Sequence, residues 1–372
     1  MKQHLIFASS LTIFASLLSG ARAAQTHHYA NAITANNIAV MQHSIINTAM
    51  GAGDRLSSAT LNTEEIFAHT AKPQNEKNPT DLYGHAPMYG TMPMYGEYND
   101  DGSIGRSGGD VIAPALGHMW FAWQHFGNDT KFQDIPVLES DIELAMVGLA
   151  GDKSRTDYGM TEWGIFTGYI GGAQEQSDMT INEDGGYFGV YKKFTFGHAN
   201  ILTALNAGVL SNSVDTITMA KTATTDDFTN IWAGGAINAA YNIEMDDTFT
   251  FQPSLYAGYT WIKSDNYTTA LGEQLNNQDF HMFEVAPTIR FIKHIGNGWF
   301  GAAHAKYVML FDNGGETELN GTEISALESD NFTEYGITLE KTIERFNITA
   351  NIGRRDGGHT GWMGGFNLKY IF

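Results

Sequence analysis

The clearest indication of the fold is the C-terminal stretch Trp362-Met-Gly-Gly-Phe366-Asn-Leu368-Lys-Tyr370-Ile-Phe372. Its aromatic side chains and Leu368 all fall on even positions, whereas Asn367 and Lys369 fall on odd ones. Successive side chains of a β-strand point to opposite faces of the sheet. The stretch therefore predicts a strand that is apolar on one face and mainly polar on the other.

The same alternation recurs through the rest of the chain from residue 118 onward. We predict twelve strands, over residues 118–127, 139–150, 161–172, 184–196, 199–210, 229–244, 248–263, 280–293, 298–311, 331–342, 345–355 and 362–372. The connections alternate between long polar ones, such as Ser211 to Phe228, and short ones, such as Gly197-His198. An even number of strands with this asymmetry is typical of a transmembrane barrel and is not required of a soluble sandwich. We therefore predict an all-β fold, a 12-stranded antiparallel transmembrane β-barrel.

The composition excludes several other classes of protein. The chain has 372 residues, a formal net charge of -20, 42% hydrophobic residues and no cysteine. Nucleic-acid binding draws its affinity from Lys and Arg at phosphates, so we expect no nucleic-acid partner. The absence of cysteine excludes a disulfide framework and a thiolate metal site. We expect no cofactor and no bound metal.

Residues 1–23 have the pattern of a secretory signal peptide. Lys2 gives a basic start, Leu5 to Leu18 is apolar, and Ala21 and Ala23 place small residues before the expected cleavage point. The apolar stretch is shorter than the roughly 20 residues that a spanning helix needs. The mature chain is therefore expected to be exported.

A helix is predicted within residues 24–60, between the signal and the barrel. Ile33, Ile38, Met41, Ile45 and Ala49 recur near the helical period, and amide and small side chains lie between them. Such a helix suits a polar, water-filled lumen better than lipid. The alternative is a helix outside the barrel that packs on nothing in particular. Residues 61–116 have the polar, Pro- and Gly-containing sequence of a linker, and the barrel is assigned to 117–372.

These features together resemble the autotransporter translocator domain of Gram-negative outer membranes. The resemblance rests on the barrel segments, on Gly53-Asp54-Arg55-Leu56 at the end of the helix, on Met119-Trp120-Phe121-Ala122-Trp123 and on Gly185-Gly186-Tyr187-Phe188-Gly189-Val190-Tyr191. It implies an outer-membrane barrel inserted by the barrel-assembly machinery, with a helix in its lumen that leads outward to a secreted passenger. It also implies that Phe366, Leu368, Tyr370 and Phe372 form the C-terminal assembly signal.

The chain departs from the family pattern before the helix. Only about six residues separate Ala23 from the helix, so we expect a missing or minimal passenger. Some members of the family cut their own linker at an Asn-Asn pair inside the lumen, and Asn36-Asn37 is a weak candidate for such a cleavage. Glu244, Glu284 and Glu340 are candidates for the carboxylates that such a reaction would need.

Several charges are expected to face the lumen because they alternate with apolar residues in the predicted strands. They are Glu244, Glu284, Arg290, Lys306, Glu340, Arg355 and Lys369. We interpret them as a hydrated, mixed-charge interior in contact with the helix rather than as an ion-selectivity filter.

We expect no enzymatic activity. The outer-membrane phospholipases share the strand number and use a His-x-Ser arrangement, but His198 is followed here by Ala199 and Asn200. The first hypothesis is a helix-plugged translocator barrel for export or surface display. The alternative is a passive pore or an adhesion barrel that uses its acidic external loops. Expected partners are outer-membrane lipids, the barrel-assembly machinery and periplasmic chaperones, and the chain is expected to be a monomer.

Overall fold

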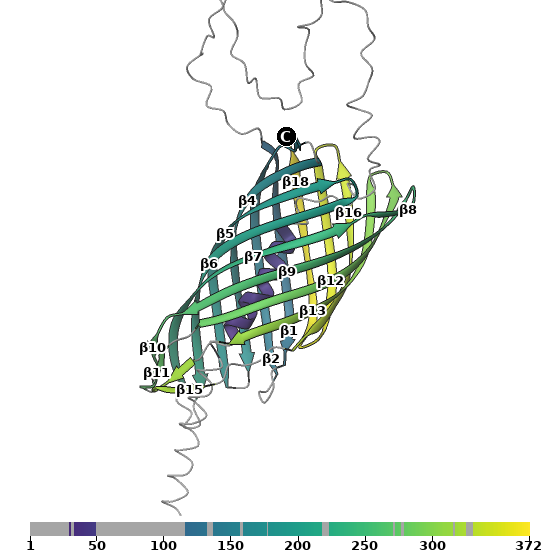
Figure 1. Cartoon of the computed structure of the whole chain (residues 1–372). Coiled ribbons are helices and arrows are strands. Elements are labelled where there is room, and N and C mark those ends of the chain that lie inside the picture. Colours follow the sequence, from purple (N-terminus) through teal and green to yellow (C-terminus); the bar gives the residue numbers. More distant parts are fainter. Residues whose placement is uncertain are drawn as a thin grey trace, which may run out of the picture.

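A computed structural model describes residue 30, residues 33–49 and residues 116–372, except 132–136, 157–158, 177, 218–222, 271, 277–278, 315–316 and 325–329. Long strands form most of it (Figure 1). They are β1 (Leu116–Thr130), β2 (Leu138–Gly151), β4 (Gly159–Gln176), β5 (Met179–Phe196), β6 (Ala199–Ile217), β7 (Ala223–Tyr241), β9 (Phe249–Ser264), β12 (Asp279–Gly296), β13 (Trp299–Gly314), β16 (Phe332–Ile343), β17 (Phe346–Gly357) and β18 (His359–Ile371). The predicted signal peptide and linker lie outside the described residues.

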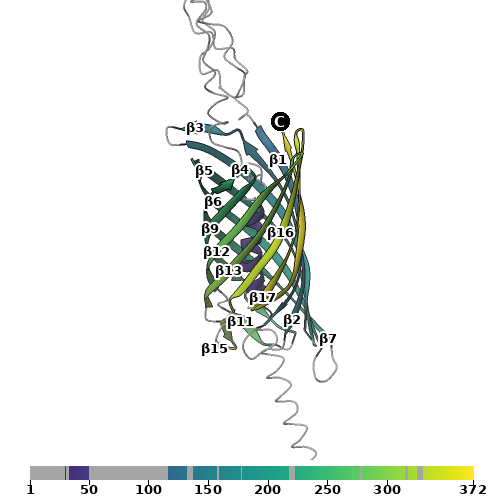
Figure 2. The same cartoon turned by 90° about the vertical axis from the view of Figure 1, so that its right-hand side faces the viewer.

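The long strands form a closed antiparallel barrel. Each pairs with the next long strand along the chain. This includes β9 with β12 and β13 with β16, although two short strands lie between the members of each of these pairs. The first strand pairs with the whole of the last one, from His118 opposite Ile371 to Thr130 opposite His359, and this pairing closes the ring. Figure 2 shows the inclined strands from the side. The predicted 12-stranded barrel is therefore confirmed.

The two ends of the barrel differ. At one end, here called the turn end, two-residue turns join β5 to β6, β12 to β13 and β16 to β17. Two of these turns place Asn297 and Glu344 at positive φ, which tight hairpins require. At the opposite loop end the β1–β2, β6–β7, β9–β12 and β13–β16 connections are longer, but two residues join β4 to β5 and Gly358 alone joins β17 to β18. The predicted alternation of short and long connections is therefore only partly present. The long loop expected between the third and fourth strands is wrong, because β4 continues to Gln176 and β5 starts at Met179.

The strands run further towards the loop end than the sequence predicts. The expected loop from Ser211 to Phe228 is wrong at both sides, because β6 continues to Ile217 and β7 starts at Ala223. The added strand residues are mostly polar, so the apolar alternation that predicts a strand is missing from the sequence there. Alternate side chains such as Asn212 and Thr216 are still buried in the interior. Where the paired strands extend beyond the hydrocarbon layer of the membrane, their outward-facing side chains no longer have to be apolar.

Short strands occupy other connections. The expected loops from Ser264 to Asp279 and from Asp312 to Asp330 contain β10 (Tyr267–Thr268), β11 (Gln274–Asn276), β14 (Thr317–Leu319) and β15 (Thr322–Ile324), which form a separate four-stranded sheet at the loop end. Two more, β3 (Ser154–Thr156) and β8 (Ile243–Asp246), extend the barrel sheet at the turn end.

The outer wall is apolar and exposed. Its large side chains include Phe121, Phe188, Leu205, Ile337 and Phe366, each between 39% and 64% exposed. So large an apolar surface marks a site of membrane or protein contact rather than of contact with water. No helix in the described part of the chain has the length and hydropathy to cross a membrane.

A helix over residues 33–49 lies inside the barrel, as both views show (Figures 1 and 2). Nearly all of its side chains are buried. Ala30 and Ile33, at its start, pack with Leu138, Met179 and Phe228, which are loop-end residues of β2, β5 and β7. The helix therefore begins towards the loop end and runs towards the turn end. The predicted lumenal helix is confirmed, and the alternative of a helix outside the barrel is excluded.

One side of the interior carries buried aromatic rings, here called the aromatic wall. Its members are Trp120 of β1, Phe166 of β4, Tyr187 and Tyr191 of β5, and Trp232 of β7, which share one buried cluster with Ile38, Met41 and Ile45 of the helix. Glycines on neighbouring strands make room for the rings. A Cβ atom at Gly208 would lie 2.3 Å from the Trp232 ring, and one at Gly148 would lie 2.2 Å from Trp120. These rings fill the space between helix and strands.

Candidate functional site: the helix in the barrel lumen

The opposite side of the interior is charged. Glu284 of β12, Lys306 of β13, Glu334 of β16 and Arg355 of β17 are all buried, and together they are called the charged wall below. This set holds two acidic and two basic side chains. Because a buried charge without a partner is very costly, such groups have to be paired.

Glu334 is the centre of the charged wall. Its Oε1 lies 2.6 Å from Lys306 Nζ, and its Oε2 accepts a hydrogen bond from Arg355 Nε at 3.1 Å. His304 Nε2 is 3.8 Å from the same carboxylate. The Arg355 guanidinium also lies over the rings of Phe126 and Phe332, at 5.1 and 5.3 Å. One carboxylate thus fixes cations from two neighbouring strands.

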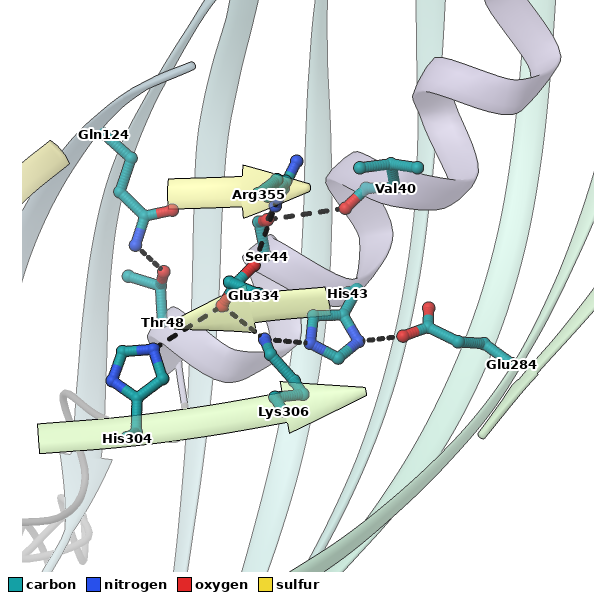
Figure 3. A network of polar contacts seen from close by, with 10 residues as sticks. All are labelled: Val40, His43, Ser44, Thr48, Gln124, Glu284, His304, Lys306, Glu334 and Arg355. Carbon is teal, nitrogen blue, oxygen red and sulfur yellow. Dashed lines mark hydrogen bonds and ion pairs between the residues drawn. The ribbon is translucent and has the colours of Figure 1, made fainter. Parts of the chain in front are cut away.

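The helix joins this network through His43 and Ser44 (Figure 3). Lys306 Nζ lies 2.7 Å from His43 Nε2, while His43 Nδ1 contacts the Glu284 carboxylate. An ammonium group can only donate, so Nε2 accepts and Nδ1 carries the proton that faces Glu284. Arg355 Nη2 donates to Ser44 Oγ at 3.2 Å. Consecutive helix residues are therefore held by three strands of the charged wall, β12, β13 and β17, while Glu334 of β16 pairs with Lys306 and Arg355 behind them.

Neutral amide contacts hold the helix elsewhere. Gln42 and Asn206 of β6 exchange two hydrogen bonds, at 2.5 and 2.8 Å. Gln124 of β1 donates to Thr48 Oγ1 at 2.5 Å. The Gln42 amide lies close over Gly234, where an added Cβ atom would be 2.2 Å from the Gln42 amide nitrogen. Hydrogen bonds from several strands therefore hold the helix on more than one side.

Most of the charges predicted for the lumen are buried inside the barrel. Glu284, Lys306, Glu340, Arg355 and Lys369 are between 1% and 8% exposed, and Arg290 is partly buried in the interior. Glu244 differs from the expectation, because it is exposed on β8. Pairing between β6 and β7 stops at Tyr241, so β8 runs beyond that ladder with no β6 residue beside it.

The C-terminal residues Phe366, Leu368, Tyr370 and Phe372 lie on β18 and at its end. Phe366, Leu368 and Phe372 are exposed, and Tyr370 is partly so. In the register with β1, Leu368 is opposite Phe121 and Phe366 is opposite Trp123. Their shared face is therefore the outer wall, next to the seam where the barrel closes.

Asn36 and Asn37 are buried in the first half of the helix. Asn36 Nδ2 lies 3.4 Å from His359 Nε2, and the other nitrogen of that ring lies 3.1 Å from Thr130 Oγ1. The carboxylates suggested for a cleavage reaction have other contacts: Glu284 meets His43, and Glu340 accepts a hydrogen bond from Asn347 at 2.7 Å. These contacts do not bring the asparagine pair and those two glutamates together.

The sequence prediction missed His43, which contacts Lys306 and Glu284, and Glu334, which pairs with Lys306 and Arg355. A signal for Glu334 was present, because it shares the parity of Thr338 and Glu340 in the predicted strand 331–342. His43 had no comparable signal. Its role depends on the rotation of the helix within the barrel, which helical periodicity alone does not fix.

Comparisons with known proteins agree with this architecture. The family model described as the autotransporter β-domain matches residues 138–360. No curated protein matches the chain. Solved structures that resemble it include the β-domain of the Bordetella autotransporter BrkA, with a TM-score of 0.60, 14% identity, and coverage of 69% of this chain and 100% of that one.

Two other solved structures show the same fold. The translocator domain of NalP from Neisseria meningitidis has a TM-score of 0.59 at 13% identity, covering 69% of this chain and 89% of that one. The transport unit of AIDA-I from Escherichia coli has a TM-score of 0.54 at 15% identity, covering 71% and 93%. The family match covers more than half of the chain, and it agrees with the closed barrel and the lumenal helix. The chain belongs to the autotransporter β-domain family, whose members are β-barrels of the Gram-negative outer membrane.

Proposed function

We propose that this barrel is the translocator of an autotransporter and that its helix plugs the lumen once export is complete. The observation that carries the proposal is the bonded helix, which begins towards the loop end and contacts β1, β6, β12, β13 and β17. In barrels of this class the long loops are external and the short turns are periplasmic. The helix would then lead whatever precedes it to the cell surface.

Conductance tests the plug. Full-length barrel in a planar bilayer should show a small, mostly closed conductance, and deletion of residues 30–56 should produce a large, steady open state. A matched control is a variant with Glu139 on the outer wall changed to Gln, which should behave as the wild type. A large open state in the full-length protein that deletion leaves unchanged would reject the plug. It would favour the alternative, a passive pore.

Export requires a separate test. A folded reporter domain fused before Tyr29 should become accessible to protease added to whole cells, because the helix start faces outward. The same reporter fused to a chain without the lumenal helix should not. If the reporter stays protected from protease in both fusions, the export role is wrong, even if the conductance experiment shows that the helix plugs the lumen.

The expected partners belong to the same proposal. The apolar outer wall suits outer-membrane lipid, and residues 1–23 would direct the chain to the periplasm, where chaperones and the barrel-assembly machinery would receive it. The seam between β18 and β1 closes the barrel without a second copy, which supports a monomer. N-terminal sequencing of the mature protein should begin at Ala24, and a start at Met1 would show that residues 1–23 are not cleaved.

A further inference from the structure

A cavity of about 200 Å³ lies between the last turns of the helix and the strands around it. Its lining is rich in side-chain amides, including Asn200, Asn238, Asn242, Gln252, Asn351 and Asn367. Several of these residues are close to the short turns at 197–198 and 242–248, so the cavity is in the turn-end half of the barrel. Amides donate and accept hydrogen bonds without carrying charge, which suits them to hydroxyl groups.

Arg290 is the exception in this lining. Among the other basic side chains of the lining, Lys306 pairs with Glu334, and His304 Nε2 lies 3.8 Å from the same carboxylate. Arg290 has no carboxylate partner among the described residues. Its hydrogen bond there is a long one, 3.4 Å from Nη1 to Gln252 Oε1. Its planar guanidinium therefore has donors left for a bidentate partner, and a carboxylate matches that geometry.

Two nearby features limit the charge of any occupant. Glu340 also lines the cavity, and the C-terminal half of the helix, with its negative dipole end, borders it. Both oppose an anion, and Arg290 is the cation that is free to attract one. A single negative charge on a molecule that otherwise presents hydroxyl groups fits this balance better than a small dianion.

We propose that this cavity binds a small hydroxylated monocarboxylic acid, with its carboxylate on Arg290 and its hydroxyl groups on the surrounding amides. The proposal goes beyond the export role and does not depend on it. The chemical class is that of a sugar acid of monosaccharide size, entering from the turn end of the barrel.

Isothermal titration calorimetry on the full-length, detergent-folded barrel tests the site with three probes. Glucuronate carries both groups that the site would recognise, glucose lacks the carboxylate, and sulfate lacks the hydroxyls of a sugar. We expect glucuronate to bind at least tenfold more tightly than either of the others. Equal affinity for glucose or sulfate, or no binding of glucuronate at millimolar concentration, would overturn the proposal.

Variants locate the binding. Arg290→Gln should abolish the preference for glucuronate over glucose, and Arg290→Lys should retain part of it, because the charge remains while the bidentate geometry is lost. The matched control is Arg354→Gln, since Arg354 is an outer-wall arginine whose partner is Asp356. Folding of each variant is checked by its heat-dependent shift in electrophoresis. Unchanged preference in both folded Arg290 variants would show that the cavity is not the site.

Discussion

The two sides of the lumen hold the same helix by different physics. The aromatic wall contacts it through apolar packing, in which Trp120, Phe166 and Trp232 share a cluster with helix residues. The charged wall contacts it through directional bonds centred on Glu334, Lys306 and Arg355. Packing tolerates small sliding and rotation, whereas a network of ion pairs and hydrogen bonds accepts one arrangement. The difference suggests that the aromatic wall supplies attraction and the charged wall sets the position of the helix.

The largest expected effect follows from breaking the charged wall at its centre. Glu334→Gln removes the negative charge that Lys306 and Arg355 share, leaving two buried cations without their carboxylate. Loss of one partner of a buried pair costs about 3–5 kcal/mol, and water in the lumen should bring the loss in the free energy of unfolding towards about 3 kcal/mol. Reversible unfolding in guanidine, with the barrel in lipid vesicles, measures it.

The control for that variant is Glu139→Gln on the outer face of β2, where the side chain is exposed. It should change the free energy of unfolding by less than about 0.5 kcal/mol. Equal losses in the two variants would mean that the charged wall contributes nothing specific.

A smaller effect is expected from overpacking the aromatic wall. Gly208→Ala places a Cβ atom 2.3 Å from the Trp232 ring, which has to move. Overpacking of this kind costs about 1–3 kcal/mol. The double variant Gly208→Ala with Trp232→Ala should be less unstable than the sum of the two single variants, because the clash is absent.

Gly186→Ala is the matched control for that series, since the nearest atom to its added Cβ would be 3.5 Å away, an ordinary contact. It should leave the free energy of unfolding nearly unchanged. If the losses in the free energy of unfolding of the two single variants simply add in the double variant, the alanine at position 208 does not clash with the Trp232 ring.

Neutral contacts should matter less than the ion pairs. Asn206→Ala leaves the Gln42 amide without both of its hydrogen bonds to that residue. A net loss of about 1 kcal/mol is expected for a neutral pair. It should appear both in the free energy of unfolding and as more frequent open events in single-channel recordings. Asn182→Ala, at an exposed position of β5, serves as control and should show neither change.

The smallest effect is expected at Gly234. An added Cβ atom meets the end of the flexible Gln42 side chain at 2.2 Å, and that end can move. Replacing a strand glycine by alanine also gains about 0.5–1 kcal/mol through reduced backbone freedom in the unfolded chain. We therefore expect Gly234→Ala to change the free energy of unfolding by less than about 0.5 kcal/mol. A loss of several kcal/mol would show that Gln42 is held rigidly.

Much of the fold could be predicted from the sequence because lipid and lumen impose a strict period of two. Residues such as Phe366 and Leu368 face the outer wall as the pattern requires, and the turn at Gly197-His198 lies where predicted. Beyond the apolar layer that constraint ends, so the extensions of β6 to Ile217 and of β7 from Ala223 were not predicted.

The site was harder to predict. Lys306 and Arg355 could be assigned to the interior from alternation, but their partners depend on which strands are neighbours and on how the helix is rotated. The link from His43 to Lys306 spans most of the chain and has no local signal. Glu244 shows that alternation alone is not enough. It has the parity of a lumen-facing residue, but it lies on a short strand beyond the paired part of β6 and β7, and its side chain is exposed.

Cross-linking in the folded barrel is the sharpest test of whether the helix is seated in the lumen. The chain has no cysteine, so Thr48→Cys with Gln124→Cys introduces one defined pair at a helix–strand contact. A short bifunctional thiol reagent should link the two positions in outer membranes. The pair Thr48→Cys with Phe121→Cys, which places the second thiol on the outer face of the same strand, should not be linked. Absence of the first cross-link in folded barrel, or equal yields for both pairs, would contradict a helix held inside the lumen.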